Sequence, residues 1–199
     1  PGYILLLFGG FCLSWGGFIV RSFEEATVWE MLFLRSFFFL LALTVFLISI
    51  YKKNTFKIIK DSGFPGVLGG FVMSFSFVAF VLAMNSTTVA NVVFIISTQT
   101  MFLAIFGYFY LKEKVSLIGS ISIFLAMSGI AIMVGDSISS GSLFGNLVAL
   151  AIPINFAILV MIIRKNTNLD MVPAIFYSGV FSLIYGVFLT ESFEFTNHD

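Results

Sequence analysis

The sequence has almost none of the side chains from which covalent cross-links and metal sites are built. It contains one cysteine, Cys12, inside a long apolar run, and one histidine, His198, in the polar tail. A single thiol cannot form an intramolecular disulfide, and one thiol with one distant imidazole cannot supply a tetrahedral metal site. We therefore expect no disulfide framework, no bound metal and no cofactor.

Charged residues are also scarce. Only 10% of the 199 residues are Asp, Glu, Lys or Arg, ten of each sign, whereas 59% are hydrophobic. With a mean hydropathy of +1.09, the chain has too few polar groups to cover the surface of a water-soluble domain. The basic residues form no stripe interleaved with aromatic residues, so we expect no binding of nucleic acid.

Long apolar runs are what the sequence has in abundance. A helix needs about 20 apolar residues to cross a hydrocarbon core of ~30 Å. Seven such runs follow one another and predict an all-α integral membrane protein, a multi-spanning bundle of seven transmembrane helices. The predicted spans are residues 2–20, 30–50, 64–84, 89–111, 117–134, 143–163 and 173–190.

The charges between the spans alternate in sign from gap to gap. The second, fourth and sixth gaps are basic and hold Lys52, Lys53, Lys57, Lys60, Lys112, Lys114, Arg164 and Lys165. Acidic residues dominate the first, fifth and last gaps. Because cytoplasmic loops carry an excess of Lys and Arg, we predict a multi-pass protein of the cell (inner) membrane whose N-terminus is cytoplasmic.

The segment from Gly135 to Ser142 is rich in Gly and Ser and is the most linker-like part of the chain. Five predicted helices precede it and two follow. After an odd number of helices, a second similar unit begins on the opposite side of the membrane, as in the inverted-topology repeats of secondary transporters. We predict a five-helix unit over residues 1–135, a linker over 136–142 and the start of a second unit over 143–199.

Small residues form a stripe on two of the predicted helices. In membranes such stripes let helix backbones approach closely. The first stripe is Gly66, Gly70 and Ser74, and the second is Gly119, Ser122, Ala126 and Gly129. We expect both to be packing faces and neither to be a ligand site.

The fourth and fifth spans carry a pattern that can be compared with known families. It has an Ala-x-x-x-Thr-x-x-Ala-Asn entry to the fourth helix, a Leu-x-Glu exit, and a fifth helix that contains Gly and ends in Gly-Ile-Ala. The matching residues are Ala83, Thr87, Ala90, Asn91, Leu111, Glu113, Gly119, Gly129, Ile130 and Ala131. This pattern resembles the EamA-type family of the drug/metabolite transporter superfamily. Trp15-Gly16 and Phe33-Leu34-Arg35 look like the family's first repeat, and Asn146 to Arg164 looks like the opening helix of its second.

The resemblance implies ten helices, arranged as five plus five with inverted topology, of which seven are present here. We interpret the chain as a fragment of a longer protein with a truncated second repeat. The family usually has a proline near the middle of its fourth helix, where this chain has Thr100, so no proline bends the helix there.

In function, the resemblance implies a permease, not an enzyme, that exports small polar metabolites such as amino acids by alternating access. The expected partners are that metabolite and the lipid bilayer. Association of two copies as a homodimer is an open alternative.

Polar side chains inside a span are costly in hydrocarbon and often mark a transport pathway. At 100° per residue, Thr88, Asn91, Thr98 and Gln99 fall within an arc of about 100° on the fourth span. Thr98 and Gln99 lie at the middle depth where transporters place substrate, and an amide both donates and accepts hydrogen bonds. The alternative is that these groups bond to one another or to neighbouring backbone.

Three more residues are candidates, each with a structural alternative. Arg35 either attracts a carboxylate or other anionic substrate, or snorkels outward, or pairs with a glutamate of the adjoining loop. Asn155, two residues after Pro153, either lines a helix break or bonds across helices. Trp15 either packs the bundle or forms an aromatic wall for substrate. The candidate substrate-binding residues are therefore Trp15, Arg35, Asn91, Thr98, Gln99 and Asn155, with no catalytic or metal-binding residue.

Two glutamates lie at the ends of spans, where no role in transport is expected. Glu30 is expected to contact water at the membrane interface. Glu113 matches the Leu-x-Glu exit, but it lies between Lys112 and Lys114 and is expected to be structural.

A seven-helix receptor or another non-transport membrane protein is the alternative function. A retinal protein needs a Schiff-base lysine in its last helix, and residues 173–190 contain none. An intramembrane metalloenzyme needs histidines that the sequence lacks, and a serine protease needs a histidine or lysine base within a span. A passive channel or a structural membrane protein stays open.

Overall fold

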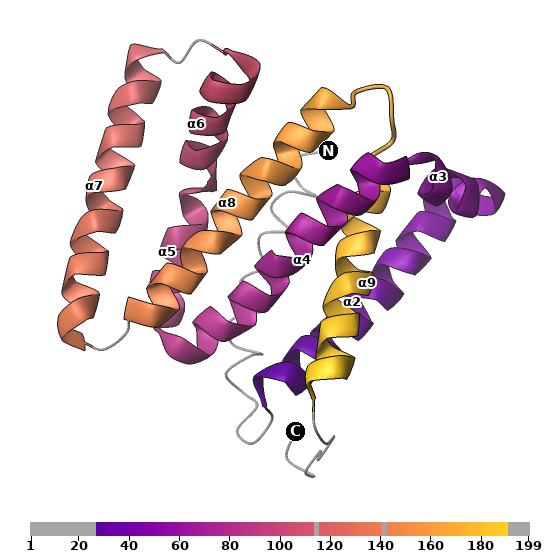
Figure 1. The fold of residues 1–199 in the computed structure, drawn as a ribbon, viewed down its shortest axis with the longest axis horizontal. Coiled ribbons are helices and arrows are strands. Elements are labelled where there is room, and N and C mark those ends of the chain that lie inside the picture. Colours follow the sequence, from indigo (N-terminus) through magenta and orange to yellow (C-terminus); the bar gives the residue numbers. More distant parts are fainter. Residues whose placement is uncertain (1–26, 114–115, 141–142, 191–199) are drawn as a thin grey trace.

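The computed structural model describes residues 27–113, 116–140 and 143–190, which are helical apart from short connections (Figure 1). The elements are α2 (Val28–Tyr51), the 3-10 helix η1 (Lys52–Asn54), α3 (Thr55–Asp61), α4 (Gly63–Ser86), α5 (Val89–Ser97), α6 (Gln99–Leu111), α7 (Leu117–Ser140), α8 (Leu143–Lys165) and α9 (Val172–Leu189).

Five of these helical segments are long and apolar enough to cross a membrane. They are Val28–Asp61, Gly63–Ser86, Val89–Leu111, Leu143–Lys165 and Val172–Leu189, and Leu117–Ile132 is a shorter apolar helix. The predicted multi-spanning helical membrane fold is confirmed. The first predicted span lies outside the described residues.

The start of α2 shows how closely side-chain chemistry sets a helix boundary. The Thr27 hydroxyl accepts a hydrogen bond from the Glu30 N–H at 3.3 Å, and the Glu30 carboxylate accepts one from the Thr27 N–H at 2.7 Å. This reciprocal capping box satisfies backbone donors that have no partner within the helix. Glu30 is only 2% exposed, so the expectation that it contacts water was wrong.

Two helices depart from the predicted spans. The span 89–111 is divided at Thr98 into α5 and α6. Helix α7 continues to Ser140, past the predicted end at residue 134 and into the segment that composition marked as a linker.

Helix α4 is the centre of the described bundle. It packs most extensively against α8 and α9, while α2 packs mainly against α9, and α5 and α6 pack against α8. Figure 1 shows α4 and α8 in the middle, with α2 and α9 on one side and α6 and α7 on the other. The helices before residue 135 are therefore joined to one another largely through α8 and α9.

The small-residue stripe on α4 forms a close helix contact with α9. Gly66, Gly70 and Ser74 are all buried. A Cβ atom built on Gly70 would lie 2.7 Å from the Ala174 carbonyl oxygen of α9, and closer still to the Tyr177 Cβ atom. Only glycine permits this approach, so the stripe is a packing face as predicted.

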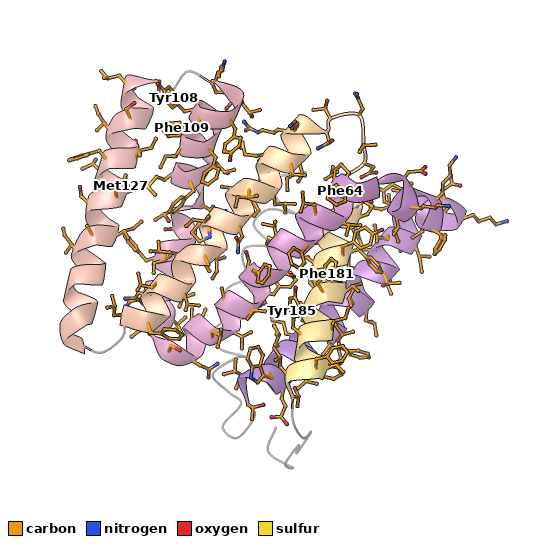
Figure 2. The ribbon with its side chains drawn as sticks, in the orientation of Figure 1. Phe64, Tyr108, Phe109, Met127, Phe181 and Tyr185 are labelled. Carbon is orange, nitrogen blue, oxygen red and sulfur yellow. The ribbon has the colours of Figure 1, made fainter. Side chains whose placement is uncertain are left out.

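Aromatic rings continue the same interface toward the other end of α9. Phe181 packs edge-on against Phe71 with ring centroids 5.5 Å apart, and Tyr185 lies 6.0 Å from Phe75. Figure 2 shows Phe181 and Tyr185 where α9 meets α4.

The second stripe, on α7, does not form such a contact among the described residues. Ser122 is exposed, and a Cβ atom on Gly129 would meet only the Phe94 ring, at an ordinary 3.4 Å. A ring, not a helix backbone, faces the glycine, so the described residues form no close helix contact at this stripe, and its role as a packing face stays a prediction. Figure 2 labels Met127 on α7 and Tyr108 and Phe109 on α6; all three side chains are exposed, on a surface suited to lipid.

Candidate functional site

Thr98 interrupts the helix that carries the densest set of polar residues. Its backbone has φ −76° and ψ 0°, its N–H bonds to the Ile95 carbonyl at 3.1 Å, and its hydroxyl donates to the same oxygen at 2.6 Å. The side chain is 6% exposed. The helix is therefore interrupted at Thr98 by a tight turn of the 3-10 type, and this break forms without a proline.

Gln99 is the first residue of α6 and follows the break directly. Its side chain is half-buried, and no described residue hydrogen-bonds to it. Its amide can therefore both donate to and accept from a ligand. Of the four polar residues on the predicted arc, Gln99 alone has these properties in the part of the chain that the structure describes.

Asn91 belongs to a different group, near the junction of α4 and α5. Its side-chain N–H donates to Thr87 Oγ1 and to Asn146 Oδ1, both at 3.3 Å, and Thr87 Oγ1 donates to Asn146 Oδ1 at 2.8 Å. Asn146 is completely buried. This polar cluster of Thr87, Asn91 and Asn146 joins α4 and α5 to the start of α8.

The sequence analysis missed Asn146 and Thr87 as a pair. Each is a polar residue within a few residues of a helix end, where polar residues are common. The resemblance gave the only signal, since Thr87 and Asn91 both belong to the entry pattern.

Arg35 points from α2 toward α4. Its guanidinium carbon lies 4.4 Å from the centroid of the Phe80 ring and 4.9 Å from that of Phe77. Its Nη1 atom is buried and has no hydrogen-bond partner. The side chain therefore neither snorkels outward nor pairs with a described acid, and cation–π contact with the two rings is its only charge-stabilising interaction there.

Asn155 is half-buried on α8, two residues after the buried Pro153. The helix runs unbroken through this proline. Asn146 and Arg164, which both contact the α4–α6 segment, each lie nine residues from Asn155, which is two and a half helical turns. By helical phase, Asn155 therefore lies on the opposite side of α8 from Asn146. Trp15 lies outside the described residues.

The structure thus distributes the candidates over several places. Arg35 lies on α2 and Gln99 on α6, on opposite sides of the α4–α8 pair (Figure 1). Asn91 and Thr98 have protein partners, whereas the amide of Gln99 and the Nη1 atom of Arg35 have none among the described residues.

The basic ends of the helices are joined by three polar contacts. The Nη1 atom of Arg164 bonds to both carboxylate oxygens of Glu113, at 2.7 and 2.9 Å. The Tyr51 hydroxyl donates to Asp170 at 2.5 Å, and the Tyr177 hydroxyl donates to the Ile59 carbonyl at 3.1 Å. Each contact joins a segment before residue 135 to α8, α9 or the loop between them.

A family model supplies the comparison that decides the class of protein. The model of the EamA-like transporter family matches residues 1–135. The chain belongs to this family. No curated protein and no solved structure gives a significant match to it.

As an EamA-family protein, the chain is a membrane transporter of the drug/metabolite transporter superfamily. Among its described residues, no group of three or more His, Cys, Asp or Glu side chains is placed to hold a metal ion.

Proposed function

We propose that this EamA-family transporter exports small polar metabolites, amino acids or similar compounds, by alternating access. The observation that carries the proposal is the buried Nη1 atom of Arg35, which has no acceptor among the described residues, where the Gln99 amide also lacks a partner. Such groups are costly in hydrocarbon and often mark a transport pathway. They match the carboxylate, amine and amide groups of a small metabolite.

Support for alternating access comes from the two ends of the bundle. At one end Glu113 and Arg164 form an ion pair that is about half exposed, 52% and 45% respectively. At the other end Asn146 is completely buried within its polar cluster. An exposed ion pair contributes about 0–1 kcal/mol, whereas leaving a buried polar group unpaired costs about 1–3 kcal/mol. The basic end is therefore the easier one to open.

The proposal includes an orientation and a location. The basic connections after α2, α6 and α8 lie at one edge of the bundle in Figure 1, so the excess of Lys and Arg is on one side of the membrane. We place that edge in the cytoplasm of a cell with the transporter in its inner membrane. We assign no enzymatic reaction to the chain.

The test is efflux from proteoliposomes that contain the protein at its natural length. Vesicles are loaded separately with each of the twenty labelled amino acids, and vesicles without protein are the control. We expect faster efflux of at least one amino acid, and further acceleration when the same unlabelled amino acid is added outside. Efflux without that acceleration indicates a channel, and no efflux of any amino acid contradicts the proposed substrate class.

A further inference from the structure

Helix α2 is fixed against α9 by contacts that also determine where Arg35 points. The Ser36 and Ser182 hydroxyls are hydrogen-bonded at 2.6 Å, and both residues are buried. One turn away, a Cβ atom on Gly179 would lie 2.9 Å from Leu40 Cγ. With this face of α2 held on α9, the neighbouring Arg35 is rotated by about 100° and reaches α4.

The rings beneath the guanidinium are themselves held in place. Phe77 packs edge-on against Phe39 of α2 with centroids 5.1 Å apart, and Phe77 and Phe80 both pack against the apolar core that joins α2, α4, α5 and α8. The charge of Arg35 therefore lies against fixed aromatic faces at the edge of that core.

The charge of Arg35 is not balanced by any described acid. Among the other acids in the described ranges, Asp61, Glu113 and Asp170 lie at the opposite end of the helices, and Asp136 is on α7, which packs against α6 and α8. The Glu30 carboxylate accepts hydrogen bonds from the N–H and hydroxyl of Thr27. Ring faces attract a cation, but they accept no strong hydrogen bond from Nη1, which stays buried and unpaired.

Arg35 thus lacks a hydrogen-bond acceptor for Nη1, and an acceptor with one negative charge would also balance its positive charge. A guanidinium is a planar fork of N–H donors that matches the two oxygens of a carboxylate. A phosphate dianion would bring an uncompensated negative charge into an apolar site, and an amine would add a second positive one. A carboxylate group neutralises the guanidinium, and the ammonium group of an amino acid would lie outside this subsite.

We propose that Arg35, held over Phe77 and Phe80, is the subsite that binds the carboxylate group of the transported metabolite. This inference rests on the proposed function and makes it narrower, because metabolites without a carboxylate would not occupy the subsite.

A binding measurement tests the inference apart from transport. The thermal stability of the purified, natural-length protein in detergent is measured with each of the twenty amino acids, and then with the carboxamide of each one that stabilises it. We expect at least one amino acid to raise the melting temperature and its carboxamide to have no effect. The inference is overturned if no amino acid stabilises the protein or if the carboxamide does so equally.

Three variants show whether Arg35 is responsible. Arg35→Gln should abolish the stabilisation by the amino acid, and Arg35→Lys should weaken its apparent affinity about tenfold or more, because an ammonium ion keeps the charge without the fork. Lys57→Gln, which removes an exposed cation from α3, is the matched control and should bind as the wild type does. Unchanged binding in Arg35→Gln would overturn the assignment.

Flux measurements distinguish a binding role from a structural one. In proteoliposomes, Arg35→Gln should reduce amino-acid efflux at least tenfold and leave carboxamide efflux at the wild-type level. Equal loss of both, with Arg35→Lys failing to restore either, would make Arg35 a structural residue and refute the inference. If the wild type transports other solutes and no amino acid, the proposed substrate class fails; carboxylate binding to the purified protein would then still support the subsite.

Discussion

The contact between α4 and α9 at Gly70 gives a prediction whose size follows from the structure. In Gly70→Ala the new Cβ atom would lie 2.7 Å from the Ala174 carbonyl oxygen and 2.9 Å from the Ser178 nitrogen. Both are backbone atoms of α9, so no side-chain rotation relieves the clash. Since carbon atoms pack best at about 3.5–4.0 Å, the helices must separate locally by about 0.7 Å or more.

A separation of that size weakens the interface beyond the mutated residue. A gap of about 0.5–1 Å forfeits between a quarter and a half of the dispersion energy of each affected contact. Overpacked sites typically lose about 1–3 kcal/mol. We therefore expect Gly70→Ala to lower the free energy of unfolding by about 2 kcal/mol, which changes the folding equilibrium by a factor of roughly 30.

The matched control is Gly129→Ala on α7. Its new Cβ atom would lie 3.4 Å from the end of the Phe94 ring, which can move aside. We expect a change within about 0.5 kcal/mol. Both variants add one methyl group to a helical glycine, so the difference between them reports packing alone.

The assay is reversible unfolding of the purified protein in mixed micelles of a mild detergent with increasing SDS, followed by circular dichroism. Gly70→Ala should unfold at a lower SDS fraction than the wild type and Gly129→Ala at the same fraction. If the two variants lose equal stability, or if Gly70→Ala loses none, the close approach of α4 and α9 described above is incorrect.

Three further predictions concern the polar contacts and the orientation. Asn146→Leu should lower the free energy of unfolding by about 1–3 kcal/mol, because buried groups on α4 and α5 lose their acceptor, and the SDS assay measures this; unchanged stability would contradict the buried cluster. Glu113→Gln should cost no more than about 1 kcal/mol, and the loss should shrink in high salt; a larger, salt-independent loss would refute an exposed ion pair. After replacement of Cys12 by Ser, Thr167→Cys should react with a membrane-impermeant maleimide only in inside-out vesicles and Ala90→Cys only in intact cells; the reverse pattern would invert the topology.

The helices themselves were predictable because each is an apolar run that ends at polar residues. The predicted bounds of α2, α4, α8 and α9 agree with the structure within two residues. The capping box at Thr27 and Glu30 was readable too, since Thr-x-x-Glu before an apolar run signals a helix start. Its effect on Glu30, a buried carboxylate at a membrane interface, was overlooked.

The break at Thr98 could not be predicted in the same way. Threonine is common inside membrane helices, and nothing in the local sequence marks this one as the residue whose hydroxyl closes a turn onto Ile95. The absence of a proline at residue 100 pointed instead to an unbroken helix.

The candidate site was predicted as residues but not as an arrangement. The positions of Arg35 and Gln99 within predicted spans identified them as polar groups in the membrane. The helical phase of a residue on one helix, however, does not determine how the neighbouring helix aligns with it. The pairing of Arg35 with Phe77 and Phe80 depends on how α2 and α4 align, and that alignment depends in turn on α9. Contacts between residues so far apart in the chain leave no local signature.

The dependence of α2 and α4 on α8 and α9 has a consequence for biosynthesis. Among the described residues, the glycine face of α4 at Gly69 and Gly70 is covered by α8 and α9, which follow α4 in the chain, and about 100 residues separate the end of α4 from the end of α9. At a synthesis rate of about 5–20 residues per second, that face waits roughly 5–20 s for its partners. During this interval the nascent helices, Arg35 among them, remain in the membrane without their native neighbours. If synthesis ended prematurely after α7, the glycine face of α4 would therefore stay uncovered. Membrane quality control can recognise such an uncovered face.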